Sequence, residues 1–458
     1  MTGAWEGRRL HFIGIGGAGM SGLALVCHEL GATVTGSDRS LSSYLKRVED
    51  AGIETFVGHD AANLPDGADV VVSTAIGPGN SELTRARSEG RRVLHRSDLL
   101  AELCSVKRTI AVAGTHGKTT TTGMLVWAMR KLDLDPAFFV GGELPGVGPG
   151  GRAANSGWGA GEWAVVEADE SDGSFLVLDP EVAVVTNIEM DHHARWSGLG
   201  ELREAFAAFV SKARTVVEPA DGSGPIATAP AGDPAAVTQV VSGFDSEHPG
   251  PAEVDLIVPG LHNLIDARAA IAVLMAVGVD PEPAAAALRD FPGVKRRLEF
   301  KGETRGTRVY DDYAHHPTEI EASLTALRGL GPERLIAVFQ PHLYSRTKAF
   351  SLAFGSALAL ADEVVVLDVY PAREEPTGPF EGVSGLDVLR PAADRDGATR
   401  TWWAPDLDAA ERAVEGLLGP DRIVVTVGAG DITSLSDRLV APEPIADTES
   451  GTSARDDG

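Results

Sequence analysis

The sequence predicts an α/β protein of three domains, each built on a mostly parallel sheet. Four observations support this prediction. Apolar runs rich in β-branched residues alternate with helical patterns along the chain. Two glycine-rich turns, at 14–19 and 114–119, each follow a predicted strand and open a predicted helix. Polar residues gather directly after the predicted strands, and a chain of 458 residues is too long for a single hydrophobic core.

The domain boundaries are predicted from changes in this pattern. We expect a Rossmann-like first domain at 1–106, a central domain at 107–294 and a second Rossmann-like domain at 295–440. Residues 441–458 contain five acidic residues, one arginine and no apolar periodicity, so we expect a disordered tail.

The first predicted domain carries a nucleotide-binding fingerprint. A predicted strand at 9–15 runs into the pattern G-x-G-x-x-G, and a helix is predicted over 21–30. The next strand ends at Ser37 and Asp38, and this acid is placed to contact a ribose hydroxyl. A strand at 68–73 then runs into a glycine- and proline-rich loop. The pattern alone favours a nucleotide such as NAD at the helix N-terminus, and a purely structural glycine loop is the alternative.

The central domain opens with a shortened phosphate loop. Its first predicted strand stops at Gly114, and Gly117, Lys118 and Thr119 open a helix. Glycines let backbone N–H groups converge on a phosphate, Lys118 can neutralise the phosphate oxygens, and the Thr119 hydroxyl can hold Mg²⁺. The strict pattern has a glycine where this chain has Val112. A chance Gly-Lys-Thr turn is the alternative.

Acidic residues follow the next two strands predicted for this domain. Glu167 and Glu170 come after one strand, and Asp191 and His192 come after the other. Because the carboxyl ends of parallel strands meet at one edge of a sheet, we expect these residues beside the phosphate loop. A carboxylate and an imidazole there can hold a second Mg²⁺. The alternative is that they cap helices and contact water.

The end of the central domain is patterned less clearly. Residues 218–259 are rich in proline, glycine and alanine, with a strand predicted at 254–258. An alanine-rich helix is predicted over 260–278, and Asn263 in its first turn either presents its amide to a base or caps the helix. Three cations follow a Pro-Gly hinge, and Arg297 among them either reaches a phosphate or joins a solvated basic patch.

The third domain again places polar residues after strands. Strands are predicted at 308–310, 335–339, 363–369 and 422–427. Tyr313 and His315 follow the first of these strands, and His342 and Arg346 follow the second.

Composition excludes some partners. The net charge of −26 repels nucleic acid and anionic membranes, so phosphate ligands must be held by local pockets. No apolar run approaches the roughly 18 residues of a membrane span, and the N-terminus lacks a signal-peptide pattern. Cys27 and Cys104 lie far apart in helical contexts, which fits a reducing cytoplasm. We therefore expect a cytoplasmic enzyme without nucleic-acid or membrane partners.

With these motifs in hand, the chain resembles the Mur ligases, the ATP-dependent amide-forming enzymes of peptidoglycan precursor synthesis. The similarity covers nearly everything except the tail, in the order of the family. It rests on F-I-G-I-G-G-A-G-M-S-G, G-T-H-G-K-T-T-T, E-A-D-E-S-D-G-S-F, T-N-I-E-M-D-H, G-x-H-N, R-R, D-D-Y-A-H-H-P-T-E and F-Q-P-H.

The resemblance implies a first domain that binds a UDP-sugar rather than NAD, a central domain that binds ATP, and a third domain that supplies the amino acid. Within the family it is most similar to members that join L-alanine to the lactyl carboxylate of UDP-N-acetylmuramate through an acyl phosphate. It implies ATP and two Mg²⁺ ions as cofactors, and a monomer or a weak homodimer.

The resemblance also assigns residues to each ligand. The UDP-sugar residues are Gly16, Gly17, Ala18, Gly19, Met20, Ser37, Asp38, Thr74 and Ala75. The ATP residues are Gly114, Thr115, His116, Gly117, Lys118, Thr119, Thr120, Asn263, Arg297 and Asp312. The metal residues are Thr119, Glu167 and His192, and the amino-acid residues are Tyr313, His315, His342 and Arg346. Lys118, His315 and Arg346 are the predicted catalytic residues.

The chain departs from the family pattern in four places. Leu343 stands where members often have arginine, which leaves Arg346 as the partner for the alanine carboxylate. Ala194 replaces a frequent aspartate, and Phe206 stands where other Mur ligases carry a modified lysine. The stretch 218–259 is also shorter than is usual in the family.

Three other functions would use parts of the same sequence pattern. A ligase that recycles a whole tripeptide onto UDP-N-acetylmuramate shares the K-R-R-L-E and H-H-P-T stretches but differs at F-Q-P-H-L-Y-S-R. A nicotinamide dehydrogenase would use the first glycine loop and Asp38, but it would not need a second nucleotide site. A phosphate-loop switch protein would hydrolyse ATP without ligase chemistry.

Overall fold

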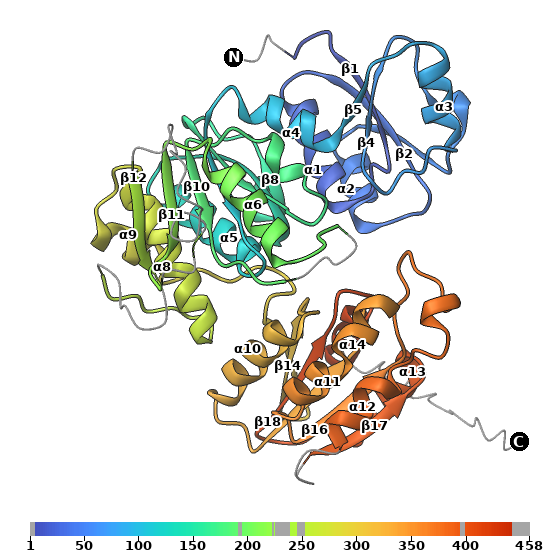
Figure 1. Cartoon of the computed structure of the whole chain (residues 1–458), viewed down its shortest axis with the longest axis vertical. Coiled ribbons are helices and arrows are strands. Elements are labelled where there is room, and N and C mark those ends of the chain that lie inside the picture. The colour runs from blue at the N-terminus through green and yellow to red at the C-terminus, as the bar shows by residue number, and fades with distance from the viewer. Residues whose placement is uncertain are drawn as a thin grey trace, which may run out of the picture. The chain divides into compact units, whose positions relative to one another are not determined.

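The structure, a computed structural model, describes residues 5–190, 195–221, 224, 239–244, 252–393 and 399–441. The chain forms two compact units, Met1–Glu299 and Phe300–Gly458, which run from blue to yellow and from orange to red in Figure 1. The first unit contains two sheets and the second contains one. Among the described helices, none is both long and apolar enough to cross a membrane.

The first sheet is parallel and has five strands in the order β3-β2-β1-β4-β5. Its strands are β1 (Arg9–Ile13), β2 (Thr33–Asp38), β3 (Glu54–Val57), β4 (Asp69–Val72) and β5 (Val93–His95). Its helices are α1 (Ala18–Glu29), α2 (Ser43–Asp50), α3 (Ser81–Ser88) and α4 (Arg96–Cys104). The strand order reverses between β1 and β4, the position at which doubly wound sheets bind ligands.

The second sheet has seven strands in the order β12-β11-β10-β6-β9-β7-β8. Only its edge strand β8 is antiparallel among the strand pairs that the structure describes. The strands are β6 (Arg108–Ala113), β7 (Ala137–Leu144), β8 (Ala154–Gly157), β9 (Trp163–Glu167), β10 (Val182–Val185), β11 (Thr215–Pro219) and β12 (Gln239–Phe244). The predicted neighbours β10, β6 and β9 are thus confirmed as adjacent and parallel.

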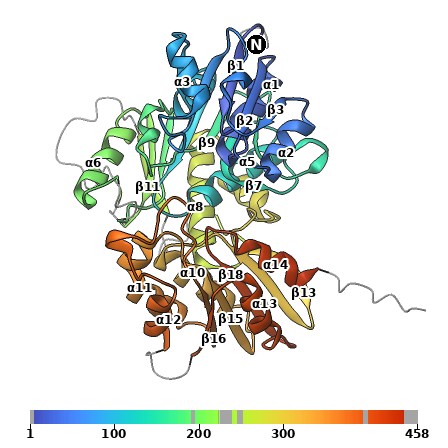
Figure 2. The same ribbon diagram turned by 90° about the vertical axis from the view of Figure 1, so that its right-hand side faces the viewer.

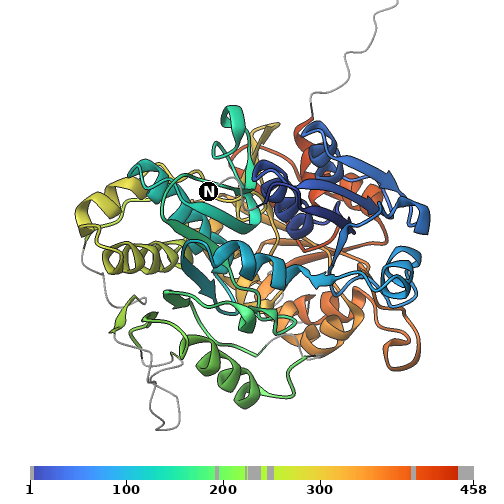
Figure 3. The same cartoon turned by 90° about the horizontal axis from the view of Figure 1, so that it is seen from above.

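Helices cover both faces of this second sheet. On one face, α5 (Lys118–Lys131), α8 (Leu261–Ala276) and α9 (Pro281–Leu288) pack side by side, with α8 and α9 in yellow in Figure 3. Small buried alanines along α8 allow this close helix packing. On the other face, Phe206 and Phe209 of α6 (Leu199–Val210) join an apolar core that also includes α1 and α4.

The third sheet, in the second unit, has the order β13-β14-β18-β15-β16-β17. Its strands are β13 (Glu299–Thr304), β14 (Thr307–Asp312), β15 (Arg334–Phe339), β16 (Glu363–Leu367), β17 (Arg400–Ala404) and β18 (Arg422–Val427). Figure 2 shows α10 (Pro317–Arg328), α11 (Tyr344–Leu358) and α12 (Leu386–Ala393) on one face, and α13 (Leu407–Glu415) and α14 (Thr433–Val440) on the other. The predicted α/β class with mostly parallel sheets is confirmed.

The strand predicted at 254–258 is wrong, because this segment is irregular. Its alternating Val254, Leu256 and Val258 instead pack against the apolar core beneath α8. The predicted tail lies outside the described residues from 442 onward, and the domain boundaries at 106 and 294 stay predictions.

Candidate active site

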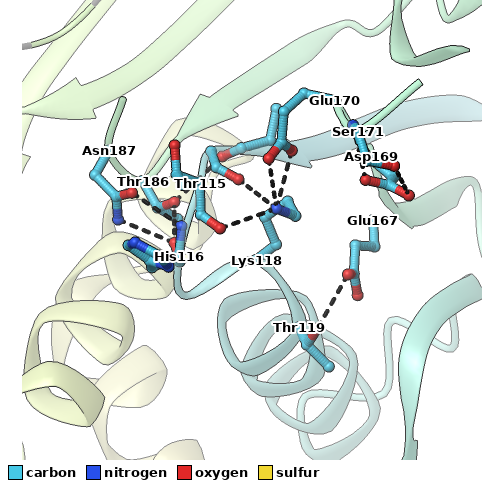
Figure 4. A network of polar contacts seen from close by, with 12 residues as sticks. Thr115, His116, Lys118, Thr119, Glu167, Asp169, Glu170, Ser171, Thr186 and Asn187 are labelled. Atoms are coloured by element: carbon cyan, nitrogen blue, oxygen red, sulfur yellow. Dashed lines mark hydrogen bonds and ion pairs between the residues drawn. The ribbon is translucent and has the colours of Figure 1, made fainter. Parts of the chain in front are cut away.

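The phosphate loop connects β6 to α5, as the sequence predicts. Gly114 has a φ of 136°, and a Cβ placed there would lie 2.0 Å from Thr186 Oγ1, so the turn requires glycine. The Thr186 hydroxyl and the Asn187 amide donate to the His116 carbonyl at 2.5 and 3.0 Å. The His116 N–H donates to Asn187 Oδ1 at 2.9 Å. The end of β10 therefore fixes the shape of the loop (Figure 4).

Lys118 points back into this loop. Its Nζ donates to the carbonyls of Gly114 and Thr115, at 2.5 and 3.1 Å. It also lies 3.1 and 2.9 Å from the two carboxylate oxygens of Glu170, just beyond β9 (Figure 4). An ammonium has three N–H donors, so these four contacts saturate it. To bind a phosphate, Lys118 must exchange at least one of them.

The electrostatics of this pair reflect its burial. Burial opposes the charge on Lys118, but the nearby carboxylates of Glu170 and Asp169 more than offset it and raise the pKa of Lys118. Burial also raises the pKa of Glu170 to about 7, against the lowering effect of Lys118. Lys118 is therefore charged at neutral pH and can attract an anionic ligand once it exchanges one of these contacts.

Thr119 and Glu167 form the oxygen-rich side of the loop. The Thr119 hydroxyl donates to Glu167 Oε1 at 3.0 Å, and the Gly141 N–H donates to Glu167 Oε2 at 2.6 Å. Arg297 Nη2 lies 3.5 Å from Thr119 Oγ1, so this predicted hinge cation does reach the loop. Hydroxyl and carboxylate oxygens are the ligands that Mg²⁺ prefers. His192, which was predicted to hold the second Mg²⁺ together with Glu167, lies outside the described residues.

Two of the predicted residues, Thr120 and Asn263, lie on the helices α5 and α8. Thr120 is buried in the first turn of α5. Asn263 is not the cap of α8, because Gly260 holds that position and the Asn263 amide donates to the Pro259 carbonyl at 2.6 Å. Its predicted contact with a base stays a prediction.

Asp266 was not predicted. It is buried on α8, and burial raises its pKa to about 8. Its Oδ1 would lie 2.4 Å from a Cβ on Gly117. Its position three residues after Asn263, on the same face of the predicted helix, is the sequence signal that could have indicated it.

The glycine loop after β1 is held by the end of β2. The N–H groups of Gly14 and Ile15 donate to the Ser37 carbonyl at 2.8 and 3.0 Å. The Gly16 N–H donates to Asp38 Oδ2 at 2.9 Å. Asp38 thus supports the loop with one oxygen, and its predicted ribose contact stays a prediction.

The remaining predicted UDP-sugar residues occupy different environments. The predicted helix begins earlier than expected, with Gly17 as its N-cap, so Ala18, Gly19 and Met20 form its first turn. Thr74 and Ala75 are exposed in the loop after β4. The Ser37 hydroxyl is buried and donates to Glu82 Oε2 at 2.5 Å, which leaves its backbone as the part nearest the loop.

In the second unit, the predicted amino-acid residues lie together after β14 and β15. The rings of Tyr313 and His315 are 5.4 Å apart, and those of His315 and His342 are 6.4 Å apart. Tyr370, which was not predicted, stacks on His342 at 5.8 Å with an angle of 14°. His315 Nδ1 lies 3.0 Å from the Tyr313 carbonyl.

Positive charge accompanies this cluster. Arg346 is buried at the start of α11. Burial, followed by the charges of Arg346 and Arg373, lowers the pKa of His342 to about 4, so His342 is neutral at neutral pH. Leu343 adopts a φ of 71°, which is uncommon for a residue with a side chain.

Asp312 serves the fold of the second unit. It is buried at the end of β14, where its two carboxylate oxygens accept from the Ala314 N–H at 2.9 Å and the Ser323 hydroxyl at 2.7 Å. Its predicted nucleotide contact stays a prediction.

Comparisons with known proteins cover the chain in three segments. Residues 9–108 match the model described as "Mur ligase family, catalytic domain", 112–248 match "Mur ligase middle domain", and 296–430 match "Mur ligase, glutamate ligase domain". The UDP-N-acetylmuramate–L-alanine ligase of Thermobifida fusca is 43% identical, over 94% of this chain and 96% of that protein. The enzyme of the same name from Saccharopolyspora erythraea is 41% identical, over 98% and 95%.

Two solved structures are also similar. The UDP-N-acetylmuramate-alanine ligase of Thermotoga maritima is 29% identical with a TM-score of 0.78, covering 94% of this chain and 98% of that one. The murein peptide ligase of Psychrobacter arcticus is 25% identical with a TM-score of 0.68, again covering 94% and 98%.

Proposed function

Because this chain belongs to the Mur ligase family, we propose that it ligates L-alanine to the lactyl carboxylate of UDP-N-acetylmuramate. ATP activates the carboxylate as an acyl phosphate, and ADP and phosphate are released. The observation that carries the proposal is the phosphate loop with Lys118 and Thr119 beside Glu167, in a chain 40–43% identical to curated L-alanine ligases. The tripeptide-recycling alternative is less well supported, since the similar murein peptide ligase has the lower TM-score.

The first step needs charge stabilisation. The lactyl carboxylate attacks the γ-phosphate of ATP in line, and Lys118 with the backbone N–H groups of the loop stabilises the negative charge that develops. Lys118 becomes available by releasing Glu170, whose raised pKa lets it take up a proton near neutral pH.

The residues at the loop fit a magnesium ion. The Thr119 hydroxyl and the Glu167 carboxylate lie 3.0 Å apart and are oxygen donors of the kind Mg²⁺ takes. We propose that Thr119 holds one Mg²⁺ beside the phosphates, and that Glu167 holds a second Mg²⁺ together with His192. A bound Mg²⁺ would neutralise phosphate charge during transfer.

The second step needs a neutral amine. The α-amino group of alanine has a pKa of about 8 or higher, so it arrives largely protonated and a base assists its attack on the acyl phosphate. We propose His315 as that base and Arg346 as the partner of the alanine carboxylate. Tyr313 and Glu319 orient His315, since its Nδ1 lies 3.0 Å from the Tyr313 carbonyl and 3.6 Å from Glu319 Oε2.

A cytoplasmic location follows from the proposed substrates and agrees with the two thiols. ATP and UDP-linked sugars are intracellular metabolites. Cys27 and Cys104 are buried and unpaired, and burial raises the pKa of both to about 12. We propose a monomer or a weak homodimer.

The decisive experiment is phosphate release from ATP with UDP-N-acetylmuramate and a panel of amino acids and peptides. We expect release that requires both the sugar nucleotide and L-alanine. Release with the tripeptide but not with alanine would favour the recycling ligase. Release without either substrate would indicate a nucleotide switch, and NADH binding would indicate a dehydrogenase.

A further inference from the structure

The hairpin formed by β7 and β8, residues 137–157, contacts three separate parts of the first unit. The hairpin is a packed element, because α1 lies directly against both of its strands. We call residues 137–157 the bridging hairpin.

One set of contacts joins the bridging hairpin to the predicted UDP-sugar site. Asn155 is buried, and its amide donates to the carbonyl of Ala18, in the first turn of α1, at 2.9 Å. Arg47 of α2 donates to Glu143 Oε1 and lies 3.5 Å from Asn155 Oδ1. The hairpin thus holds both the helix that begins at the glycine loop and the helix that follows β2.

A second set joins the hairpin to the phosphate site. The Gly141 N–H donates to Glu167, the carboxylate that accepts from Thr119. A Cβ on Gly142 would lie 2.6 Å from Val294 Cγ1 and 3.2 Å from Thr119 Cγ2, so the backbone approaches the helix start closely. The backbone of β7 therefore contacts or closely approaches two of the predicted metal residues.

A third set joins the hairpin to the cationic hinge segment. Lys295 Nζ lies 2.8 Å from Glu143 Oε2, and the Lys295 N–H donates to the Glu143 carbonyl at 2.9 Å. Arg297, two residues further on, reaches Thr119. Glu143 is thus shared between Arg47, a cation of α2, and Lys295, a cation of the hinge segment.

We propose that Glu143 is a positioning residue that couples UDP-sugar binding to ATP binding through the bridging hairpin. This inference rests on the proposed function, because that function identifies the two ligands as the UDP-sugar and ATP. The side chain of Glu143 is only 12% exposed, so its two ion pairs are screened less than surface pairs. A UDP-sugar that holds α1 and α2 in one position therefore favours one position of β7. That position of β7 in turn favours one arrangement of Glu167 and Thr119. By thermodynamic linkage, ATP must favour sugar binding by the same factor.

The test measures the affinity for UDP-N-acetylmuramate by calorimetry, with and without a non-hydrolysable ATP analogue and Mg²⁺. We expect the sugar to bind more tightly with the analogue, by at least about fivefold, a typical allosteric coupling factor. Glu143→Gln keeps the shape of the side chain and removes its charge. It should bring the ratio of the two dissociation constants close to one while leaving the melting temperature within a few degrees.

Arg47→Gln is a second test variant, and it can be measured even if Glu143→Gln does not fold. Arg47→Gln should lower the same ratio of dissociation constants. Added to a folded Glu143→Gln variant, it should not change this ratio further, because both substitutions remove the same ion pair. Lys46→Gln is the matched control. Lys46 lies on the same helix as Arg47, is exposed and pairs with Asp50 at 3.8 Å. The ratio of dissociation constants in Lys46→Gln should therefore equal that of the wild type.

Two results would overturn the proposal. One is a wild-type ratio of one. The other is an unchanged ratio in every folded variant of Glu143 and Arg47. Failure of the wild type to bind UDP-N-acetylmuramate at all is a different result, since it rejects the proposed function itself.

Discussion

Lowering the pH should destabilise the second unit through His342. This ring lies beside Arg346 and Arg373, and burial together with their charges lowers its pKa from 6.5 to about 4. A group with a lowered pKa binds fewer protons in the folded state than in the unfolded state between these two values. The free energy of unfolding must therefore fall as the pH falls through that window.

The size of the effect follows from the two pKa values. At pH 5 the unfolded ring is almost fully protonated and the folded ring is mostly neutral, which corresponds to about 2 kcal/mol by linkage. The side chain is partly exposed, so solvent screening reduces the expected loss to about 1 kcal/mol. For a unit of this size that loss lowers the melting temperature by about 3 °C.

The assay compares wild type and His342→Gln, which cannot ionise, by calorimetry at pH 7 and pH 5. Other groups also titrate, so the informative quantity is the difference between the two proteins in how far each melting temperature drops. We expect the variant to drop less, by about 3 °C. Arg346→Gln should reduce the drop in part, because it removes one of the charges that lower the pKa. Equal drops in wild type and His342→Gln would refute the reasoning.

Three further predictions concern the phosphate loop. Lys118→Ala should lower kcat by about 10²-fold or more, because it removes a preorganised charge, and near-normal turnover would remove the loop from the mechanism. Thr119→Val should raise the Mg²⁺ concentration for half-maximal activity by about 10-fold or more, whereas Thr119→Ser should stay close to wild type; equal titrations of the two variants would argue against Thr119 as a ligand. Gly114→Ala should cost about 3 kcal/mol of stability, because its φ of 136° is strained for alanine and its Cβ would overlap Thr186. Gly52→Ala, with a φ of 85° in open space, should cost only about 1 kcal/mol, and similar melting temperatures for the two variants would contradict that difference.

The parts of the site that were predictable from the sequence depend on local signals. A strand, a glycine turn and a helix lie within a few residues of one another around Lys118, so their order alone determines the phosphate loop. The same holds for the glycine loop after β1. Placing Glu167 beside Thr119 required only that two parallel strands be neighbours, which the structure confirms for β6 and β9.

The parts that were not predictable depend on partners far away in the sequence. Glu143 and Arg47 are 96 residues apart, and neither belongs to a pattern that indicates the other. Asn155 reaches Ala18 across 137 residues. The strand predicted at 254–258 failed for a related reason. Alternating apolar residues predict one buried face, but they do not indicate whether a sheet or a helix pair will cover it.

The charges around the phosphate loop explain why ATP binding should require a divalent cation. Glu167, Asp169 and Glu170 all act on Lys118 and together exceed its single charge. A triphosphate would add more negative charge to a chain whose net charge is already −26. When Lys118 releases Glu170, its ammonium group can bind the phosphate. The Glu170 carboxylate then loses the cation that neutralised it. Two changes would each reduce the excess negative charge. One is protonation of Glu170, whose pKa is about 7, and the other is binding of Mg²⁺ at Thr119 and Glu167. The apparent affinity for ATP should therefore weaken when Mg²⁺ is removed. The loss should be larger above pH 7 than below it, because only the protonated form of Glu170 offsets part of the missing positive charge.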